Sequence, residues 1–575
     1  MIDRSAQTGY PMRRWLLVAV FVAGGALLLA RAVDLQVVND EFLREHGDAR
    51  SLRVMSVPAH RGIIADRNGE PLAISTPVDS VWVRPRDVAA AGDRQGELAA
   101  VLGMDAAGLR EMLQDRIGRE FVYLKRHLTP VEARTVEALG MPGVHLQREY
   151  RRYYPAGEIA AHLIGFTNVD DQGQEGVELA FDSWLRGTPG EKRVLKDRLG
   201  RTVRNVESIR PPDPGRPLYL SIDRRVQYLA YRELKLAVEH HRARSGSLVM
   251  VDPRTGEIIA MAVQPSYNPN NRGDLKSANY RNRAATDTFE PGSTLKPFTI
   301  AAALLSGRFR PNTIVETRPG FFRVSDHTIR DIRDFGTLDV AGVIRRSSNV
   351  GASKIALALG PEPLWQMYSA VGLGRDTGSG FPGEASGVLH PYKSWSEVEL
   401  ATIAFGYGIS VTALQLAQGY AAIAADGVQR PVSLQRLEGA APEGRQVIQA
   451  DIAREVRTMM EGVAEADGTA RPAAIRGYRI AGKTGTAHKA APGGYAEDQY
   501  MSLFAGMAPA RDPQLVLVVI IDEPHGDQYY GGQVAAPVFA EVMRGALRIF
   551  SIAPDDLPAL DARLIAAAPA GSAGE

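Results

Sequence analysis

The chain of 575 residues contains no cysteine. Disulfide bonds, thiolate metal sites and a lipid-modified cysteine are therefore excluded. The chain also lacks an excess of charge of either sign, because it has 67 basic and 66 acidic side chains. No basic stripe of the kind typical of nucleic-acid binding stands out. The eleven histidines are scattered, without the spacing of a metal site. We therefore expect no cofactor, no metal and no nucleic-acid partner, in a chain long enough for more than one domain.

An apolar segment near the N-terminus predicts a membrane anchor over residues 15–33. Residues 15–30 carry no charge, and the span reaches nineteen residues if Arg31 extends toward the interface. This is close to the ~20 residues that a helix needs to cross a bilayer. Three arginines precede it, so residues 1–14 are expected to stay cytoplasmic while the rest crosses. The alternative is a cleaved signal peptide, because Ala30-Arg31-Ala32 fits the small-residue cleavage pattern.

The stretch from Phe289 to Phe298 predicts the start of a buried helix. Proline is tolerated only in the first helical turn, so Pro297 indicates that the helix begins at or just after Ser293. Lys296 then lies on the same face as Ser293. Burial and the positive end of the helix dipole lower a lysine's pKa, and a neutral amine can take the serine proton. The alternative is a serine N-cap beside a surface lysine, since Ser-x-x-Lys also occurs by chance.

Two further motifs follow Ser293-x-x-Lys296 in an informative order. Ser347-Ser348-Asn349 lies 54 residues after Ser293, and Lys483-Thr484-Gly485-Thr486 lies 136 residues further on. Ser-x-x-Lys, Ser-x-Asn and Lys-Thr-Gly in this order are the active-site motifs of penicillin-binding proteins and serine β-lactamases. The sequence resembles that superfamily.

The resemblance implies roles for four residues, three of them catalytic and one substrate-binding. Ser293 is expected to be the nucleophile and Lys296 its base. Ser347 is expected to relay a proton between lysine, serine and leaving group, while the side-chain amide of Asn349 holds the substrate's peptide carbonyl. Taken alone, Ser347 or Asn349 could equally be an ordinary helix cap.

The Lys-Thr-Gly stretch is expected to bind the substrate. Flanking apolar residues favour a strand over a turn, and the strand period of two places Lys483 and Gly485 on one face. Because Gly485 lacks a side chain, an extended substrate is expected to approach there and pair as an added strand. Lys483 with the hydroxyls of Thr484 and Thr486 offers a site for a terminal carboxylate. The resemblance implies an oxyanion hole formed by the N–H groups of Ser293 and Thr486.

Residues 34–215 are predicted to form a mixed α/β module without catalytic chemistry. Three stretches resemble the N-terminal pedestal motifs of class B penicillin-binding proteins: Arg61-Gly62 with Asp66-Arg67-Asn68-Gly69, Arg151 to Gly157, and Gly173 to Glu178. Nothing resembles a glycosyltransferase domain, so a bifunctional class A enzyme is not expected. The proline-rich residues 210–217 mark the domain boundary, because they fit neither a helix nor a central strand.

Residues 216–552 are predicted to form an α+β penicillin-binding transpeptidase domain, with an antiparallel sheet covered by helices. Residues 553–575 are expected to be a loose tail. Strands are predicted over residues 247–251, 257–263, 479–487, 501–508 and 514–521, and helices over residues 98–117, 176–185, 350–359 and 538–550.

Further stretches resemble the division-specific, FtsI-type transpeptidases, among them Asn282-Arg283, Phe405 to Gly408 and Tyr529 to Gly532. The resemblance extends from the anchor to about Ile552. It implies a D,D-transpeptidase of the bacterial inner membrane that cross-links D-Ala-D-Ala stem peptides in the periplasm, at the division septum. β-Lactams would acylate its serine. The implied partners are an FtsW-type lipid-II polymerase and other division proteins, and Tyr407, Tyr500, Tyr529 and Tyr530 are candidate walls of the cleft.

Other functions remain as alternatives: an elongation-specific class B transpeptidase, a D,D-carboxypeptidase, a β-lactamase or a β-lactam sensor. A class A β-lactamase carries a Glu-x-x-x-Asn stretch between the second and third motifs, and Asn349 is the last asparagine of this chain. A sensor usually needs a signalling domain, which the fourteen residues before the anchor are too few to form.

Overall fold

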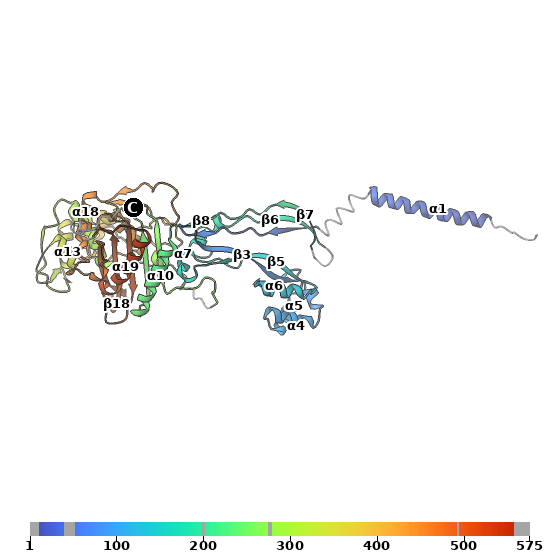
Figure 1. Cartoon of the computed structure of the whole chain (residues 1–575), viewed down its shortest axis with the longest axis horizontal. Helices are drawn as coiled ribbons and strands as arrows, with labels where there is room; N and C mark the ends of the chain where they lie inside the picture. The colour runs from blue at the N-terminus through green and yellow to red at the C-terminus, as the bar shows by residue number, and fades with distance from the viewer. Residues whose placement is uncertain (1–10, 39–51, 197–201, 274–278, 492–493, 557–575) are drawn as a thin grey trace, which may run out of the picture. The chain divides into compact units, whose positions relative to one another are not determined.

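The computed structural model describes residues 11–38, 52–196, 202–273, 279–491 and 494–556 (Figure 1). The first helix, α1, spans Pro11–Val33 and continues into a π-helical turn over Asp34–Val38. It is long and apolar enough to cross a membrane, and its apolar window is not buried against the protein. The anchor predicted over residues 15–33 lies within this helix. Parts of the predicted terminal segments, residues 1–10 and 557–575, lie outside the described residues.

The chain divides into two compact units, each built from several stretches of sequence. The first comprises residues 1–60, 77–150 and 187–214, and the second comprises residues 61–76, 151–186 and 215–575. The boundary predicted near residue 215 coincides with the start of the last stretch. The pedestal-like motifs, however, belong to the second unit, because the two short stretches that carry them pack there. The limits of the functional domains stay a prediction.

The first unit contains a three-stranded antiparallel sheet in the order β1-β6-β7. Its strands are β1 (Leu52–Val57), β6 (Gly190–Lys196) and β7 (Thr202–Arg210). The other elements are α3 (Pro85–Ala89), α4 (Arg94–Leu102), α5 (Ala106–Asp115), β4 (Val122–Leu128), α6 (Pro130–Ala138) and parts of β3 (Pro71–Val83) and β5 (Val144–Tyr153). Leu98, Leu109 and Val136 are buried together in one apolar core.

The helix predicted over residues 98–117 is in fact two helices, α4 and α5. Gly103 ends α4 with φ +65°, a left-handed conformation that glycine adopts readily. Asp105 then caps α5 by accepting a hydrogen bond from the backbone N–H of Gly108 at 2.7 Å. Helical spacing continues across the break, so periodicity alone does not reveal it.

The helix predicted over residues 176–185 is also divided, into α8 (Gly176–Ala180) and α9 (Asp182–Leu185). Phe181 separates them with φ −111° and ψ 24°, outside the helical region. In this arrangement the carboxylate of Asp182 accepts a hydrogen bond from Arg61 at 2.8 Å. The break thus accompanies a contact between residues 121 positions apart, and the local sequence pattern does not predict the break.

The second unit is built around a five-stranded antiparallel sheet in the order β10-β9-β19-β18-β17. The strands are β9 (Ser245–Val251), β10 (Ile258–Gln264), β17 (Ala481–Ala491), β18 (Gly494–Ala508) and β19 (Leu515–Asp522). Helices α10 (Arg224–His240) and α19 (Gly531–Ile549) contact each other and the sheet, and α17 (Ala413–Ala424) contacts β9 and β19. Every residue of β9 and β10 is buried. The predicted α+β fold is confirmed, and β17 lies at one edge of the sheet.

The connection from β10 to β17 contains most of the helices and two of the three motifs. Its helices are α11 (Arg283–Thr286), η4 (Gly292–Leu295), α12 (Lys296–Leu305), α13 (Val340–Arg346), α14 (Asn349–Leu359), α15 (Pro361–Ala370), η5 (Tyr392–Ser394), α16 (Glu397–Ile403), α17, α18 (Ala450–Glu461) and η6 (Arg471–Ala473). Its short strands are β11 (Ile314–Glu316), β12 (Phe321–Val324), β13 (His327–Arg330), β14 (Thr337–Asp339), β15 (Val428–Gln429) and β16 (Arg445–Gln446). The unit also contains η2 (Gly157–Ile159), α7 (Ala161–Ile164), β2 (Ile64–Ala65) and β8 (Leu218–Tyr219).

The closing helix α19 begins at Gly531, seven residues before the predicted start at residue 538. Pro537 lies before the predicted start and, without an N–H, cannot donate an intrahelical hydrogen bond. The structure keeps Pro537 inside the helix. A Cβ on Gly531 would lie 2.2 Å from Leu503 O and 2.3 Å from Gly485 O, so only glycine lets the helix start against β17 and β18.

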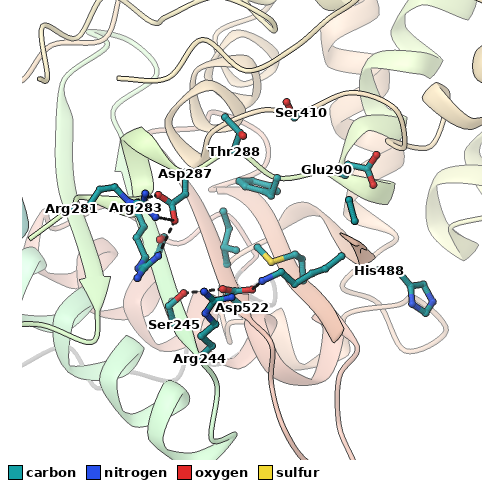
Figure 2. A pocket seen from close by; sticks show the side chains of 17 residues that line it. Arg244, Ser245, Arg281, Arg283, Asp287, Thr288, Glu290, Ser410, His488 and Asp522 are labelled. Atoms are coloured by element: carbon teal, nitrogen blue, oxygen red, sulfur yellow. Dashed lines mark hydrogen bonds and ion pairs between the residues drawn. The ribbon is translucent and has the colours of Figure 1, made fainter. Parts of the chain in front are cut away.

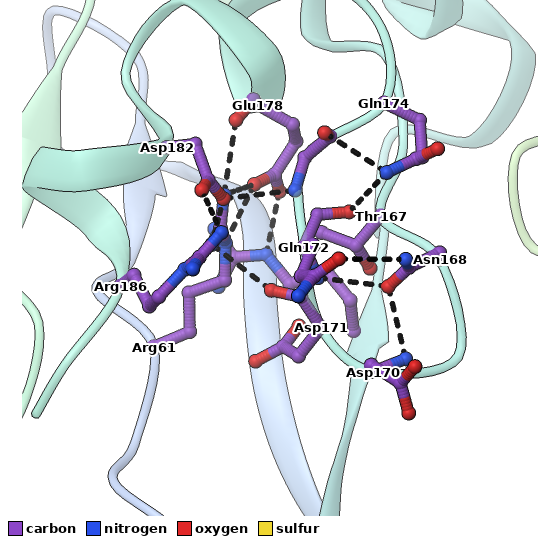
Figure 3. Close-up of polar contacts among 12 residues, drawn as sticks. Arg61, Thr167, Asn168, Asp170, Asp171, Gln172, Gln174, Glu178, Asp182 and Arg186 are labelled. Atoms are coloured by element: carbon purple, nitrogen blue, oxygen red, sulfur yellow. Dashed lines mark hydrogen bonds and ion pairs between the residues drawn. The ribbon is translucent and has the colours of Figure 1, made fainter. Parts of the chain in front are cut away.

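A buried ion cluster joins the three pedestal-like motifs (Figure 3). The guanidinium of Arg61 donates to Glu178 at 2.8 Å and to Asp182 at 2.8 Å. Arg152 donates to the other oxygen of Glu178 at 2.6 Å. The side chains of Arg61, Arg152 and Glu178 are at most 1 % exposed. Each of these three residues comes from a different motif, so the cluster holds distant stretches of the second unit together.

We expect Glu178→Ala to lower the free energy of unfolding by about 3–5 kcal/mol, because two buried guanidinium groups lose their carboxylate. Thermal and urea unfolding of the full-length protein in detergent, followed by circular dichroism, measures this change. The control is Glu207→Ala, whose pair with Arg193 is 56 % and 44 % exposed, and whose loss should cost less than about 1 kcal/mol. Equal, small effects of both variants would show that the cluster does not stabilise the unit.

Candidate active site

The first motif lies where a 3₁₀ turn becomes a helix. The turn η4 contains Ser293 and leads directly into α12, with Pro297 in its first turn, as the sequence predicted. Ser293 is partly exposed, while the helix after it is buried as far as Leu304. Within the part of the chain that the structure describes, the backbone N–H of Ser293 has no hydrogen-bond acceptor. This N–H is therefore free to bind an oxyanion.

The amine of Lys296 is fully buried and contacts the second motif as well as the first. Its Nζ lies 2.9 Å from Ser293 Oγ, 2.7 Å from the carbonyl oxygen of Ser347 and 2.7 Å from Asn349 Oδ1. Burial lowers the pKa of Lys296 to about 7, against the opposing effect of the negative charge on Asp331. A substantial neutral fraction is therefore present near neutral pH, and its lone pair lies within reach of the serine proton.

Ser347 occupies a strained backbone position between two lysines. It ends α13 with φ +61°, in the left-handed region that costs a non-glycine residue roughly 1–3 kcal/mol. This conformation directs its carbonyl oxygen to Lys296 Nζ. Its Oγ lies 3.3 Å from Lys296 Nζ and accepts a hydrogen bond from Lys483 Nζ at 2.8 Å. The strain is consistent with a functional position that the surrounding contacts hold in place.

The third motif lies on β17, as predicted, at the edge of the sheet. Lys483 is fully buried, and both this burial and the neighbouring Lys296 lower its pKa. Thr484 Oγ1 contacts Thr469 Oγ1 at 2.9 Å, and Thr486 Oγ1 accepts a hydrogen bond from the backbone N–H of Gly531 at 3.0 Å. The amine of Lys483 is thus directed at Ser347, while the Thr486 hydroxyl contacts the start of α19.

The structural reason for Gly485 differs from the predicted one. A Cβ at this position would lie 2.9 Å from Thr294 Cγ2 and 3.0 Å from the carbonyl oxygen of Pro291. The space that a side chain would occupy is therefore filled by the turn that carries Ser293, not left open for substrate. Gly485 allows the nucleophile's turn to pack directly on β17. Pairing with a substrate strand would instead use the backbone groups at the open edge of β17.

Four side chains from the three motifs form one connected polar chain. It runs from Ser293 Oγ through Lys296 Nζ to Ser347 Oγ and on to Lys483 Nζ, with steps of 2.9, 3.3 and 2.8 Å. A proton that leaves the serine can move along this path to the second serine. The sequence predicted these residues as one site, and the structure brings them into hydrogen-bond contact.

Asp331 is a positioning residue that the sequence did not reveal. It lies just after β13 and belongs to no recognised motif. Its carboxylate accepts hydrogen bonds from Ser348 Oγ at 2.6 Å and from the backbone N–H of Val350 at 3.0 Å, and also from that of Asn349. Asp331 thereby caps α14 and fixes Asn349 beside Lys296. Only the tertiary structure reveals this positioning role, because the local sequence around Asp331 resembles that of any aspartate in a loop.

The predicted cleft aromatics form a stack next to the third motif. The rings of Tyr500 and Tyr529 are 4.2 Å apart and nearly parallel, and Tyr530 follows at 4.5 Å from Tyr529. Tyr407 lies elsewhere, with its hydroxyl accepting a hydrogen bond from the backbone N–H of His488 at 3.1 Å. Which of these rings contacts a ligand stays a prediction. Among the described residues, no group of three or more His, Asp or Glu side chains is placed to hold a metal ion.

Comparison with known protein families identifies two domains in the chain. A family described as "Penicillin binding protein transpeptidase domain" matches residues 246–544, and one described as "Penicillin-binding Protein dimerisation domain" matches residues 56–220. The first match contains all three motifs. The second contains the three pedestal-like motifs.

The similarity to individual proteins extends over nearly the whole chain. The chain is 47 % identical to the peptidoglycan D,D-transpeptidase FtsI of Escherichia coli over 537 residues, 92 % of this chain and 91 % of that protein. It is 46 % identical to the probable peptidoglycan D,D-transpeptidase PbpC of Pseudomonas aeruginosa over 542 residues, 94 % and 96 % of the two chains. A solved peptidoglycan synthetase from Bifidobacterium adolescentis is 26 % identical, with a TM-score of 0.70 over 89 % of this chain and 99 % of that one.

The N-terminal apolar helix and the similarity to FtsI indicate a single-pass inner-membrane protein. The predicted resemblance is confirmed along the chain from the pedestal-like motifs to α19. The chain therefore belongs to the penicillin-binding proteins and is a serine-type peptidoglycan D,D-transpeptidase.

Proposed function

We propose that this transpeptidase cross-links stem peptides through an acyl-enzyme on Ser293. Ser293 Oγ attacks the carbonyl of the penultimate D-Ala while its proton passes to the neutral amine of Lys296. The terminal D-Ala leaves as its nitrogen takes a proton through Ser347. An amine of a neighbouring stem peptide then attacks the ester and regenerates the serine. The observation that carries this proposal is the buried amine of Lys296, with a pKa of about 7, at 2.9 Å from Ser293 Oγ.

The substrate would bind along the open edge of β17. An extended peptide can add to an edge strand by main-chain hydrogen bonds. Asn349 would hold a peptide carbonyl, and the hydroxyls of Thr484 and Thr486 the terminal carboxylate, with Lys483 completing the polar chain. The backbone N–H groups of Ser293 and Thr486 would form the oxyanion hole, with each donor worth about 3 kcal/mol. β-Lactams would occupy the same site and acylate Ser293.

We also assign the enzyme to the division septum, with an FtsW-type lipid-II polymerase and other division proteins as partners. The support is the similarity to FtsI over 92 % of this chain. Residues 23–26 of α1 are all alanine or glycine, and small residues let transmembrane helices approach closely. The arginines before the anchor favour a cytoplasmic N-terminus and a periplasmic catalytic domain. An elongation-specific enzyme with the same chemistry is the alternative.

Ser293→Ala and Lys296→Ala should each abolish covalent labelling by a fluorescent penicillin, because one variant lacks the nucleophile and the other lacks the base. Gel fluorescence of the full-length protein measures labelling. Ser293→Ala should change the free energy of unfolding by only about 1 kcal/mol, as for a residue at a helix start. The control is Lys393→Ala, an exposed lysine in η5, which should label normally. Labelling that survives either active-site change would place the nucleophile elsewhere.

The acylation rate should rise with pH around the pKa of Lys296. Only the neutral amine accepts the serine proton, so the rate constant should fall about tenfold per pH unit below pH ~7 and level off above it. Asp331 raises this pKa through its charge, so Asp331→Asn should move the midpoint to lower pH. Stopped-flow acylation by a chromogenic cephalosporin gives the profile.

The matched control for the pH profile is Asp334→Asn, an exposed aspartate three residues further along the same loop. It should leave the midpoint unchanged. An unchanged midpoint in Asp331→Asn as well, or a rate that does not depend on pH near neutrality, would argue against Lys296 as the base.

The acyl-enzyme should persist. Asn349 is the last asparagine of the chain, so the glutamate–asparagine pair of class A β-lactamases is absent from the sequence between the second and third motifs. Without a positioned base, hydrolysis loses a general-base factor of roughly 10²–10⁴. We expect near-stoichiometric penicillin consumption and an intact-mass shift that maps to the peptide containing Ser293. Rapid catalytic turnover of penicillin would instead favour a β-lactamase.

A further inference from the structure

A cavity in the second unit, which carries the catalytic residues and is called the catalytic unit below, is lined in part by the stretch that leads to the nucleophile (Figure 2). Its volume is about 400 Å³, within the range of small-ligand sites, and no residue of the three motifs lines it. Residues 245–247 of β9 and the ends of β17 and β19 line it from the sheet. Residues 287–290, which shortly precede Ser293 in the chain, also line it. The cavity is thus separate from the catalytic residues but close to them along the chain.

Two arginines of this cavity share one carboxylate. Arg281 forms a two-point contact with Asp287, at 2.9 and 3.0 Å, and Arg283 donates one hydrogen bond to the same carboxylate at 2.9 Å. The side chain of Arg283 is only 19 % exposed. Its Nε and Nη2 groups have no acceptor among the described residues. Arg283 therefore presents spare, largely desolvated donors at the cavity.

The other charges near the cavity are paired and cancel. Arg244 contacts Glu523 at 2.9 Å, and Lys489 contacts Asp522 at 2.8 Å. The Glu290 carboxylate lies on the opposite side from Arg281 and Arg283 in Figure 2, and it accepts hydrogen bonds from Gly408 and Tyr495. Burial raises the pKa of Glu290, which disfavours its negative charge. Asp287 is shared by two guanidinium groups, so one positive charge is in excess locally at the Arg281–Arg283 end, away from Glu290.

Uncharged groups complete the lining. The hydroxyls of Ser247, Thr288 and Ser410 have no hydrogen-bond partner among the described residues. Phe289, Met501 and Ile520 supply apolar surface to the lining. A ligand that fits this cavity carries an anionic group at one end and a mixed polar and apolar body, which is the character of a short peptide with a free carboxylate.

We propose that this cavity binds the carboxylate end of a short peptide, with Arg283 as the anion-binding residue. A guanidinium with two free N–H directions binds a carboxylate through two parallel hydrogen bonds, as it also binds phosphate. The established activity acts on stem peptides, so a peptide carboxylate is the source of the anion that this enzyme meets. The choice of a stem-peptide end rests on the proposed function, since that chemistry both consumes and releases carboxylate-terminated chains.

The position of the cavity connects it to the nucleophile. Phe289 pairs with Val411 through two backbone hydrogen bonds of 2.9 Å, and the N–H of Gly292 donates to Gly406 at 3.1 Å. The wall of the cavity and the turn that carries Ser293 are therefore parts of one hydrogen-bonded stretch. A peptide end bound beside Phe289 lies against this stretch, outside the acyl-donor site.

The test uses full-length protein in detergent whose Ser293 has first been acylated with penicillin, so that the donor site is blocked. N-acetyl-D-Ala-D-Ala is titrated against it by ligand-observed NMR, in parallel with its C-terminal amide and with inorganic phosphate. We expect saturable binding of the acid and binding of the amide weaker by about tenfold or more, as for loss of a charge-assisted hydrogen bond. Arg283→Gln should weaken binding of the acid to the same extent.

Thr288→Trp provides a second variant outside the ion pairs, because Thr288 is exposed at the rim and a large ring there would fill the cavity. It should also abolish binding. Arg116→Gln, an exposed arginine of the first unit with the same change in charge, should bind normally. Equal affinity for acid and amide, phosphate binding as tight as the acid, or unchanged binding in both cavity variants would overturn the proposal. Failure of penicillin to acylate Ser293 would instead count against the proposed function.

Discussion

The fully buried amine of Lys296 is the constraint on which the catalytic unit depends. An amine without access to solvent needs hydrogen-bond acceptors, and Ser293, in the turn just before α12, supplies one of them. The other acceptors, the carbonyl of Ser347 and the side chain of Asn349, belong to the segment between α13 and α14. Burial also lowers the pKa of the amine to about 7. The same burial that demands this packing therefore makes the lysine usable as a base.

The surrounding fold supplies these acceptors through a strained backbone at one position and unusually close packing at others. Ser347 accepts a left-handed backbone so that its carbonyl and hydroxyl both face the lysines. Glycines at positions 485 and 531 let the nucleophile's turn and α19 approach β17 more closely than any side chain would permit. Asp331 fixes the start of α14 from outside. Strain and close approach concentrate at the site, where contacts from several elements hold them.

Electrostatic pairing recurs in the catalytic unit in two forms. The Arg61–Glu178–Arg152 cluster is buried and, with Asp182, has as many carboxylates as guanidinium groups, so its charges hold distant stretches together. The Arg281–Asp287–Arg283 cluster is open toward a cavity and has one guanidinium more than its carboxylate can occupy. This difference in charge balance and exposure separates a structural ion cluster from one that can take up an anion.

The sequence by itself determined the chemistry and the class of fold. The three motifs identified every residue of the polar chain, Pro297 placed the helix start, and apolar runs located the strands of the five-stranded sheet, because these depend on local backbone rules and side-chain type. Only the structure revealed the two breaks in predicted helices, the helical Pro537, the role of Asp331 and the reason for Gly485. The break between α4 and α5 is made by local chemistry at Gly103 and Asp105, which the periodicity of the apolar residues masks. The second break, the start of α19, the role of Asp331 and the reason for Gly485 involve partners far away in sequence, about which periodicity carries no information.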